Sequence, residues 1–202
     1  MSKESINRKH WEMERSATGR QEESDLLEVI DGENETYQRM LREHGITPET
    51  FEHADFKKLP YVNFTDALEM ARVAQPWEDP ANPKTDFLKE LRLAIASELG
   101  IENDEKALER LRLYTAVGSL LDIKHGKDAF VEYEKEKRIF RVFIDATADP
   151  KRKKPIADTV IVDTEKLGDP VSNEKKYLGE IAEVAKAIVR IFKTQETATD
   201  TN

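Results

Sequence analysis

The stretch that decides the fold is KDAFVEYEKEKRIFRVFIDAT, which runs from Lys127 to Thr147. Apolar residues recur at every second position over 129–134 and again over 139–147, and a period of two is typical of β-strands. The charged residues between the two runs predict a tight turn. A third apolar run, Ala157–Val162, follows a loop that contains two prolines. Because short connections favour an antiparallel meander, the sequence predicts three antiparallel strands.

Helical patterns flank these strands on both sides. Residues 86–99 place apolar side chains on one face and end before Gly100, and residues 104–121 carry a second, wider apolar stripe. After the strands, residues 173–192 form a long final helix with a continuous apolar face. A sheet of three strands cannot bury its apolar face alone, so the helices must cover it. We therefore predict an α+β core domain at 86–194, with a small three-stranded antiparallel sheet flanked by helices.

The residues before the core carry weaker signals. The segment QPWEDPANPK at 75–84 has three prolines, which excludes a helix or a central strand and sets a boundary. Residues 25–85 predict an irregular helical N-terminal arm, and 1–24 and 195–202 read as disordered tails. The helices of the arm are weakly amphipathic and need a surface to pack on. That surface is either a protein partner or the chain's own core.

The composition restricts the classes of function. The chain has no cysteine, which excludes disulfides and thiolate metal sites. It has neither an apolar signal region at its start nor a run of about 18 apolar residues, so we expect a soluble, cytoplasmic protein with no membrane contact. The net charge of −9 opposes nucleic-acid binding over most of the surface, which would then require a local basic patch.

One basic run is a candidate for such a patch. Lys151, Arg152, Lys153 and Lys154 follow one another in the loop before the third predicted strand. They either contact nucleic acid or form a solvated loop that protects a sheet edge from pairing with other chains.

Aspartates supply the candidate chemistry. Asp128 begins the first strand, and Asp145 interrupts the second, although aspartate disfavours strand interiors. Thr147 lies two residues after Asp145 and hence on the same face. Two converging carboxylates can hold Mg²⁺ or Mn²⁺ while water and phosphate complete the coordination. In the structural alternative, Asp128 bonds to local amides and Asp145 pairs with Arg141.

This layout resembles the core of the PD-(D/E)XK nuclease superfamily over residues 104–192. Asp128 stands where that family has its first acid, and Asp145 stands at the acid of its (D/E)-x-K motif. Thr147 replaces the motif's lysine, and Lys151 is the nearest following cation. Glu109 is similar in position to an accessory glutamate of the preceding helix.

The resemblance implies metal-dependent hydrolysis of nucleic acid, with Mg²⁺ or Mn²⁺ bound by Asp128 and Asp145. Asp128, Asp145, Thr147 and Lys151 would be the catalytic residues, and the threonine leaves open a catalytically degenerate relative. A second hypothesis is a non-enzymatic interaction or regulatory protein that uses the acidic arm and the C-terminal helix. The long apolar face of that helix would also suit a homodimer.

Overall fold

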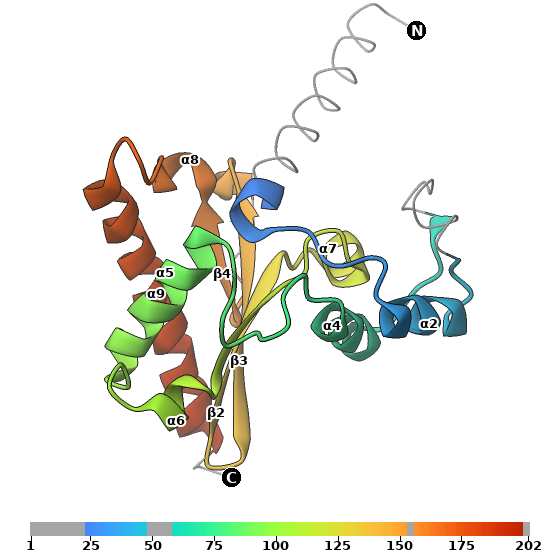
Figure 1. Cartoon of the computed structure of the whole chain (residues 1–202), viewed down its shortest axis with the longest axis horizontal. Helices are drawn as coiled ribbons and strands as arrows, with labels where there is room; N and C mark the ends of the chain where they lie inside the picture. The colour runs from blue at the N-terminus through green and yellow to red at the C-terminus, as the bar shows by residue number, and fades with distance from the viewer. Residues whose placement is uncertain (1–22, 48–57, 153–155, 200–202) are drawn as a thin grey trace, which may run out of the picture.

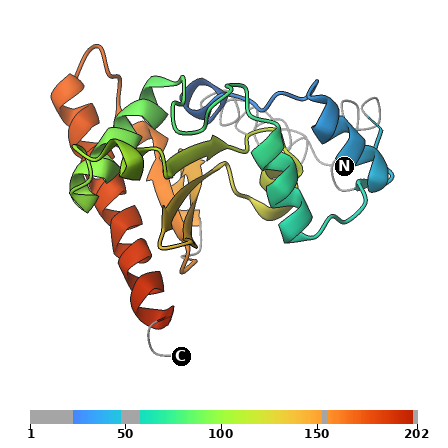
Figure 2. The same ribbon diagram turned by 60° about the horizontal axis from the view of Figure 1, so that its bottom comes forward.

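The computed structural model describes residues 23–47, 58–152 and 156–199. One β-sheet stands at the centre of the molecule, and helices cover both of its faces (Figure 1). Turning the molecule separates the two layers, with α5 and α9 on one side of the sheet and α2, α4 and α7 on the other (Figure 2). The α+β class is confirmed. None of the helices in these ranges combines the length and apolarity that a membrane span requires.

The sheet differs from the predicted meander. It contains four strands in the order β1-β2-β3-β4, and their bounds are Leu111–Thr115, Ala129–Lys135, Arg138–Thr147 and Thr159–Asp163. The first two pairings are antiparallel, but β4 runs parallel to β3. The prediction of three antiparallel strands was therefore wrong in both the number and the direction of strands.

The missed strand lies inside the predicted helix at 104–121. That segment forms α6 (Glu105–Leu108), then β1, then α7 (Leu120–His125). Its apolar residues are dense enough to fit a period of 3.6 and a period of 2. The structure uses the period of 2, because Leu111 and Leu113 enter one core cluster while Tyr114 enters the other. Gly118, at φ +81°, then turns the chain into α7.

The parallel strand follows from the point at which β4 begins. Thr159 lies opposite Phe143 and Asp163 lies opposite Thr147. A parallel connection usually needs about a dozen residues to return the chain. Because β4 begins opposite Phe143, the chain has to return only from the end of β3 at Thr147 to the level of Phe143. The connection that contains the short helix η2 (Pro150–Arg152) is long enough to do this.

The first face of the sheet carries the larger core. It packs against α5 (Asp86–Leu99) and α9 (Glu174–Thr199), and the two helices also contact each other. Gly100 ends α5 at φ +68°, as predicted. Helix α9 continues five residues beyond the boundary expected at 194. The apolar residues of α9 that are buried here are Tyr177, Ile181, Ala185, Ile188, Val189 and Phe192.

The second face is covered by the N-terminal arm. Helices α2 (Glu35–Glu43) and α4 (Phe64–Val73) begin at the caps Asn34 and Asn63. Together with α7 they pack on Tyr114, Phe130 and Phe143 of the sheet. The arm therefore docks on the chain's own core. Residues 48–57 of the predicted arm lie outside the described residues. The short helix α8 (Thr164–Leu167) follows β4 directly.

Candidate acidic site between strands β2 and β3

The pairing of β2 with β3 brings the two candidate aspartates together. Ala129 lies opposite Ile144, and the amide of Asp128 donates to the carbonyl of Ile144 at 2.9 Å. Asp128 stands one residue before this last pair, close enough for the negative charge of Asp145 to raise its pKa. Asp145 also lies opposite Ile161 of β4, so its strand has a neighbour on both sides.

The carboxyl group of Asp128 is in an unfavourable setting for a charge. The residue is only 5% exposed, and its Oδ2 accepts a hydrogen bond from the amide of Ala146 at 2.7 Å. Burial, together with the negative charges of Asp122, Glu23 and Asp145, raises the pKa of Asp128 to about 8, although the hydrogen bond from Ala146 lowers it. Asp128 is therefore largely protonated at neutral pH.

The two additional carboxylates come from separate parts of the chain. Asp122 lies in the first turn of α7, where its Oδ2 accepts from the amide of Gly118 at 2.9 Å. Glu23 belongs to a helical turn in the arm, and the chain after it is fastened to β1 because the hydroxyl of Thr115 donates to the carbonyl of Glu28 at 2.6 Å. The acidic site therefore consists of Glu23, Asp122, Asp128 and Asp145.

A buried lysine lies on the same face, and the sequence reasoning missed it. Lys127 is 6% exposed, its Nζ donates to the hydroxyl of Thr159, and it lies 5.2 Å from the centroid of the Phe143 ring. Phe143 is two residues before Asp145 and shares its face. The only signal in the sequence was a lysine directly before a strand that the pattern already predicted to be buried.

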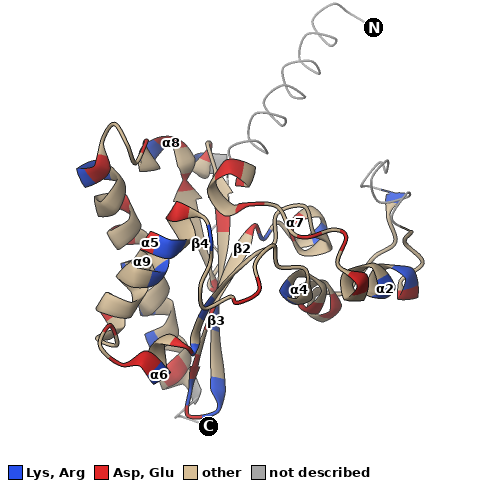
Figure 3. Cartoon of the chain, in the orientation of Figure 1, with Lys and Arg blue, Asp and Glu red and all other residues tan. Residues whose placement is uncertain are grey.

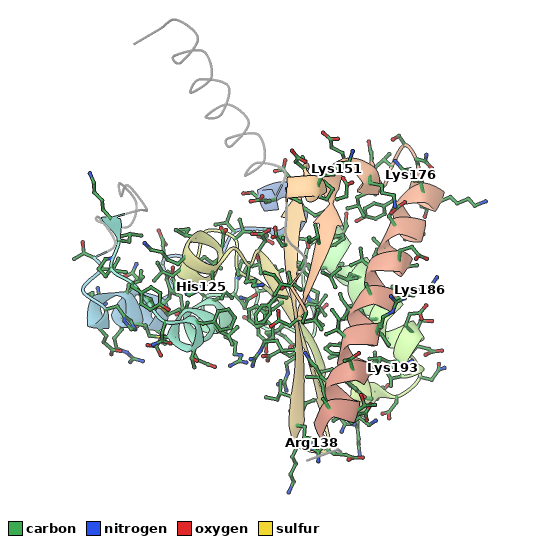
Figure 4. The ribbon with its side chains drawn as sticks, turned by 180° about the vertical axis from the view of Figure 1, so that it is seen from behind. His125, Arg138, Lys151, Lys176, Lys186 and Lys193 are labelled. Atoms are coloured by element: carbon green, nitrogen blue, oxygen red, sulfur yellow. The ribbon has the colours of Figure 1, made fainter. Side chains whose placement is uncertain are left out.

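The other residues of the predicted site play different parts. The hydroxyl of Thr147 accepts from the amide of Asp149 at 3.2 Å, which stabilises the turn after β3. Lys151 lies exposed in η2, at the end of the sheet toward which β3 runs (Figure 4). Lys153, Lys154 and the side chain of Arg152 lie outside the described residues.

Two further expectations concern neighbouring side chains. Glu109 caps the end of α6 beside the β2–β3 hairpin, about seven strand positions or roughly 23 Å from Asp128. Arg141, the expected partner of Asp145, donates from Nε to Glu132 at 2.6 Å instead. Glu109 is therefore too far away to assist the aspartates. Because Arg141 pairs with Glu132, an ion pair with Arg141 does not explain why Asp145 lies within the strand.

The donor set fits one class of metal. In the described ranges, no three His, Cys, Asp or Glu side chains lie close enough to enclose an ion. A closed zinc site needs about four protein ligands and does not fit these residues. Mg²⁺ and Mn²⁺ take oxygen ligands, and Mg²⁺ is commonly held by one or two carboxylates while it keeps several waters. Asp128 and Asp145 fit that pattern.

Comparison of the chain with protein-family models, with curated proteins and with solved structures finds no match.

Proposed function

We propose that this chain is a divalent-metal-dependent, nuclease-like protein whose site is the pair Asp128 and Asp145. The observation that carries the proposal is the placement of these two acids at the paired ends of β2 and β3, where the charges of Asp145, Asp122 and Glu23 all act on Asp128. A bound cation removes the repulsion that neighbouring carboxylates exert on a buried carboxyl group such as that of Asp128. A bound Mg²⁺ or Mn²⁺ would let Asp128 lose its proton at neutral pH.

The residues of the site have distinct roles in this proposal. Asp128 and Asp145 hold the ion, and a bound ion of this kind polarises a phosphoryl oxygen and lowers the pKa of water. The backbone amide of Ala146 fixes the carboxyl group of Asp128 through its 2.7 Å hydrogen bond. Lys127 provides the positive charge that Thr147 cannot provide. Its burial on the face of Asp145 favours it over the exposed Lys151.

The proposed substrate is a phosphodiester of nucleic acid. The net charge of −9 opposes long contacts with a polyanion, so binding should depend on the ion and on local cations such as Lys151. This limits the expected footprint to a few phosphates near the end of β3.

The first test is a titration with Mg²⁺ or Mn²⁺ followed by amide NMR and by thermal unfolding. We expect shifts centred on Asp128 and Asp145, and a rise in Tm of several degrees at millimolar metal, because an ion that binds only the folded state stabilises it. Both effects should disappear in Asp128→Asn and Asp145→Asn. Glu134→Gln, on the same strand but beside the hairpin, is the matched control and should behave as the wild type.

Catalysis is tested separately with plasmid, single-stranded DNA and RNA. Lys127→Met should bind metal like the wild type and lose at least tenfold in the rate of cleavage. If metal produces no site-specific shift, the proposal fails. If metal binds but no substrate is cut, the chain is the degenerate relative that Thr147 allows.

The second hypothesis, a protein that only binds partners, receives less support from the surfaces first assigned to it. The arm and α9 both bury their apolar faces within the chain. The apolar face of α9 that made a homodimer attractive is thus occupied by α5 and the sheet. A partner would need a different surface, and one exists at the edge of β3.

A further inference from the structure

Strand β3 is longer than β4, which pairs with the edge of β3 that faces away from β2. It spans Arg138–Thr147 and pairs with β2 from Arg138 to Ile144, whereas β4 covers it only from Phe143 to Thr147. The amide of Phe143 donates outward to the carbonyl of Asp158 at 2.8 Å. By the alternation of a strand, the backbone groups of Arg141 and Ile139 also point outward, and β4 does not reach them.

A side chain from α9 takes the place of a neighbouring strand at this edge. The amide of Arg141 donates to Oε1 of Gln195 at 3.2 Å, and Nε2 of Gln195 donates to the carbonyl of Arg141 at 2.8 Å. A carboxamide that both accepts from and donates to one residue makes the same pair of bonds that an adjacent β-strand makes. The edge thus already holds a small mimic of a peptide bond.

A groove accompanies this edge. It has a volume of about 420 Å³ and is lined by residues that include Phe64, Ile139, Arg141, Phe143, Asp158 and Gln195. Ile139 is 54% exposed, which is unusual for an isoleucine within a strand of this sheet. The volume suits several side chains of a short peptide.

We propose that the edge of β3 at residues 139–141 binds an extended peptide with acidic and apolar residues, which adds to the sheet as a fifth strand and displaces the amide of Gln195. Strand addition supplies affinity through main-chain hydrogen bonds, and the side chains along the groove supply selectivity. Apolar residues of the peptide would contact Ile139 and Phe64.

The charge at this edge selects the partner. Lys137 and Arg138 are adjacent and exposed at the hairpin end of β3, and Figure 3 shows this end of the strand in the colour of Lys and Arg. The side chain of Arg138 extends from the same end in Figure 4. An acidic peptide complements these charges, whereas a second copy of the chain would set them against one another. Nucleic acid has no main-chain amides and carbonyls with which to extend the sheet.

The test uses the full chain and a fluorescein-labelled peptide of alternating valine and aspartate, with binding followed by fluorescence anisotropy. We expect saturable binding below about 1 mM, since short strand additions bind weakly. Ile139→Pro should weaken binding at least tenfold, because it removes an outward N–H that the β2 ladder does not use. Ile139→Val keeps that N–H and should bind within twofold of the wild type.

A variant with the opposite effect separates this mechanism from loss of folding. Gln195→Met keeps the length of the side chain, frees the backbone groups of Arg141, and should tighten peptide binding about fivefold. A peptide of alternating valine and lysine should bind at least tenfold more weakly than the acidic peptide.

Four results would overturn the proposal. They are no binding at 1 mM, equal binding by Ile139→Pro with native circular dichroism, preference for a single-stranded oligonucleotide over the acidic peptide, and self-association through this edge in light scattering. Each of these outcomes is independent of metal binding at Asp128, so the test is separate from that of the proposed nuclease-like activity.

Discussion

At the scale of single residues, Asp128 links stability to pH. Its pKa is about 8 in the folded chain, and an ordinary aspartate titrates near 4 when unfolded. Between these two values the folded state keeps a proton that the unfolded state releases, so the free energy of unfolding falls as pH rises toward 8. Without divalent metal, we expect wild type to lose roughly 1–3 kcal/mol more than Asp128→Asn between pH 5 and pH 8. Urea unfolding at both pH values measures this difference, and identical pH dependence in the two proteins would contradict it.

Glu132 is another buried residue that carries a charge. It is 4% exposed, and its Oε1 accepts from Nη2 of Arg72 and from Nε of Arg141. Removal of one partner from a buried ion network leaves the others uncompensated. Glu132→Gln should therefore lower the free energy of unfolding by about 3 kcal/mol. Glu134→Gln, two residues along the same strand and less buried, should change it by less than about 0.5 kcal/mol. A small effect of Glu132→Gln in the same urea titration would mean that the network contributes little.

The sequence identified some of these residues and not others, for physical reasons. Asp145 could be identified from the sequence because aspartate is disfavoured inside a strand, and such exceptions often mark functional sites. Lys127 could not be identified from the sequence, because its burial and its contact with Thr159 depend on residues distant in the sequence. Arg72 and Glu132 lie 60 positions apart, and only the docking of α4 on the sheet brings them together.

At the scale of elements, the hairpin between β2 and β3 is closed by residues poorly suited to it. Glu136 and Lys137 have φ of +53° and +64°, the pattern of a type I′ turn, in which Asn-Gly is preferred. The pair Glu136→Asn and Lys137→Gly should raise the free energy of unfolding by about 1 kcal/mol. The expected signature in urea is a higher midpoint at an unchanged slope. Lys137→Arg, which keeps the unfavourable conformation, should leave the midpoint where it is; a shift of equal size there would exclude the backbone explanation.

Local patterns predicted the elements that carry clear caps or a strict period. Gly100 ends α5 where the sequence placed it. Strand β1 was not predicted because its alternating pattern covers only five residues, and these lie within a longer apolar stripe that also fits a helix. The direction of β4 depends on where the chain re-enters beside Phe143, and no local pattern encodes that point.

At the scale of the whole molecule, the sheet joins two cores into one structure. The cluster that contains Leu41 and the cluster that contains Ile95 lie on opposite faces of the same strands. We therefore expect one cooperative transition in urea, with coincident curves from tryptophan fluorescence and far-UV circular dichroism. Leu41→Ala and Ile95→Ala should each shift that transition by about 2–5 kcal/mol. An early, separate transition in Leu41→Ala would show instead that the arm unfolds independently.

The arm's attachment to the sheet also has a consequence for synthesis. Helix α4 leaves the ribosome roughly 70 residues before β3, which at about 5–20 residues per second is a wait of roughly 4–15 seconds. During that time Leu68, Met70 and Ala71 lack the surface that later buries them. The opposite face of the sheet then waits for α9, the last of the described helices to appear. The nascent chain should therefore engage chaperones that hold apolar segments, first at α4 and later at the uncovered face of the sheet.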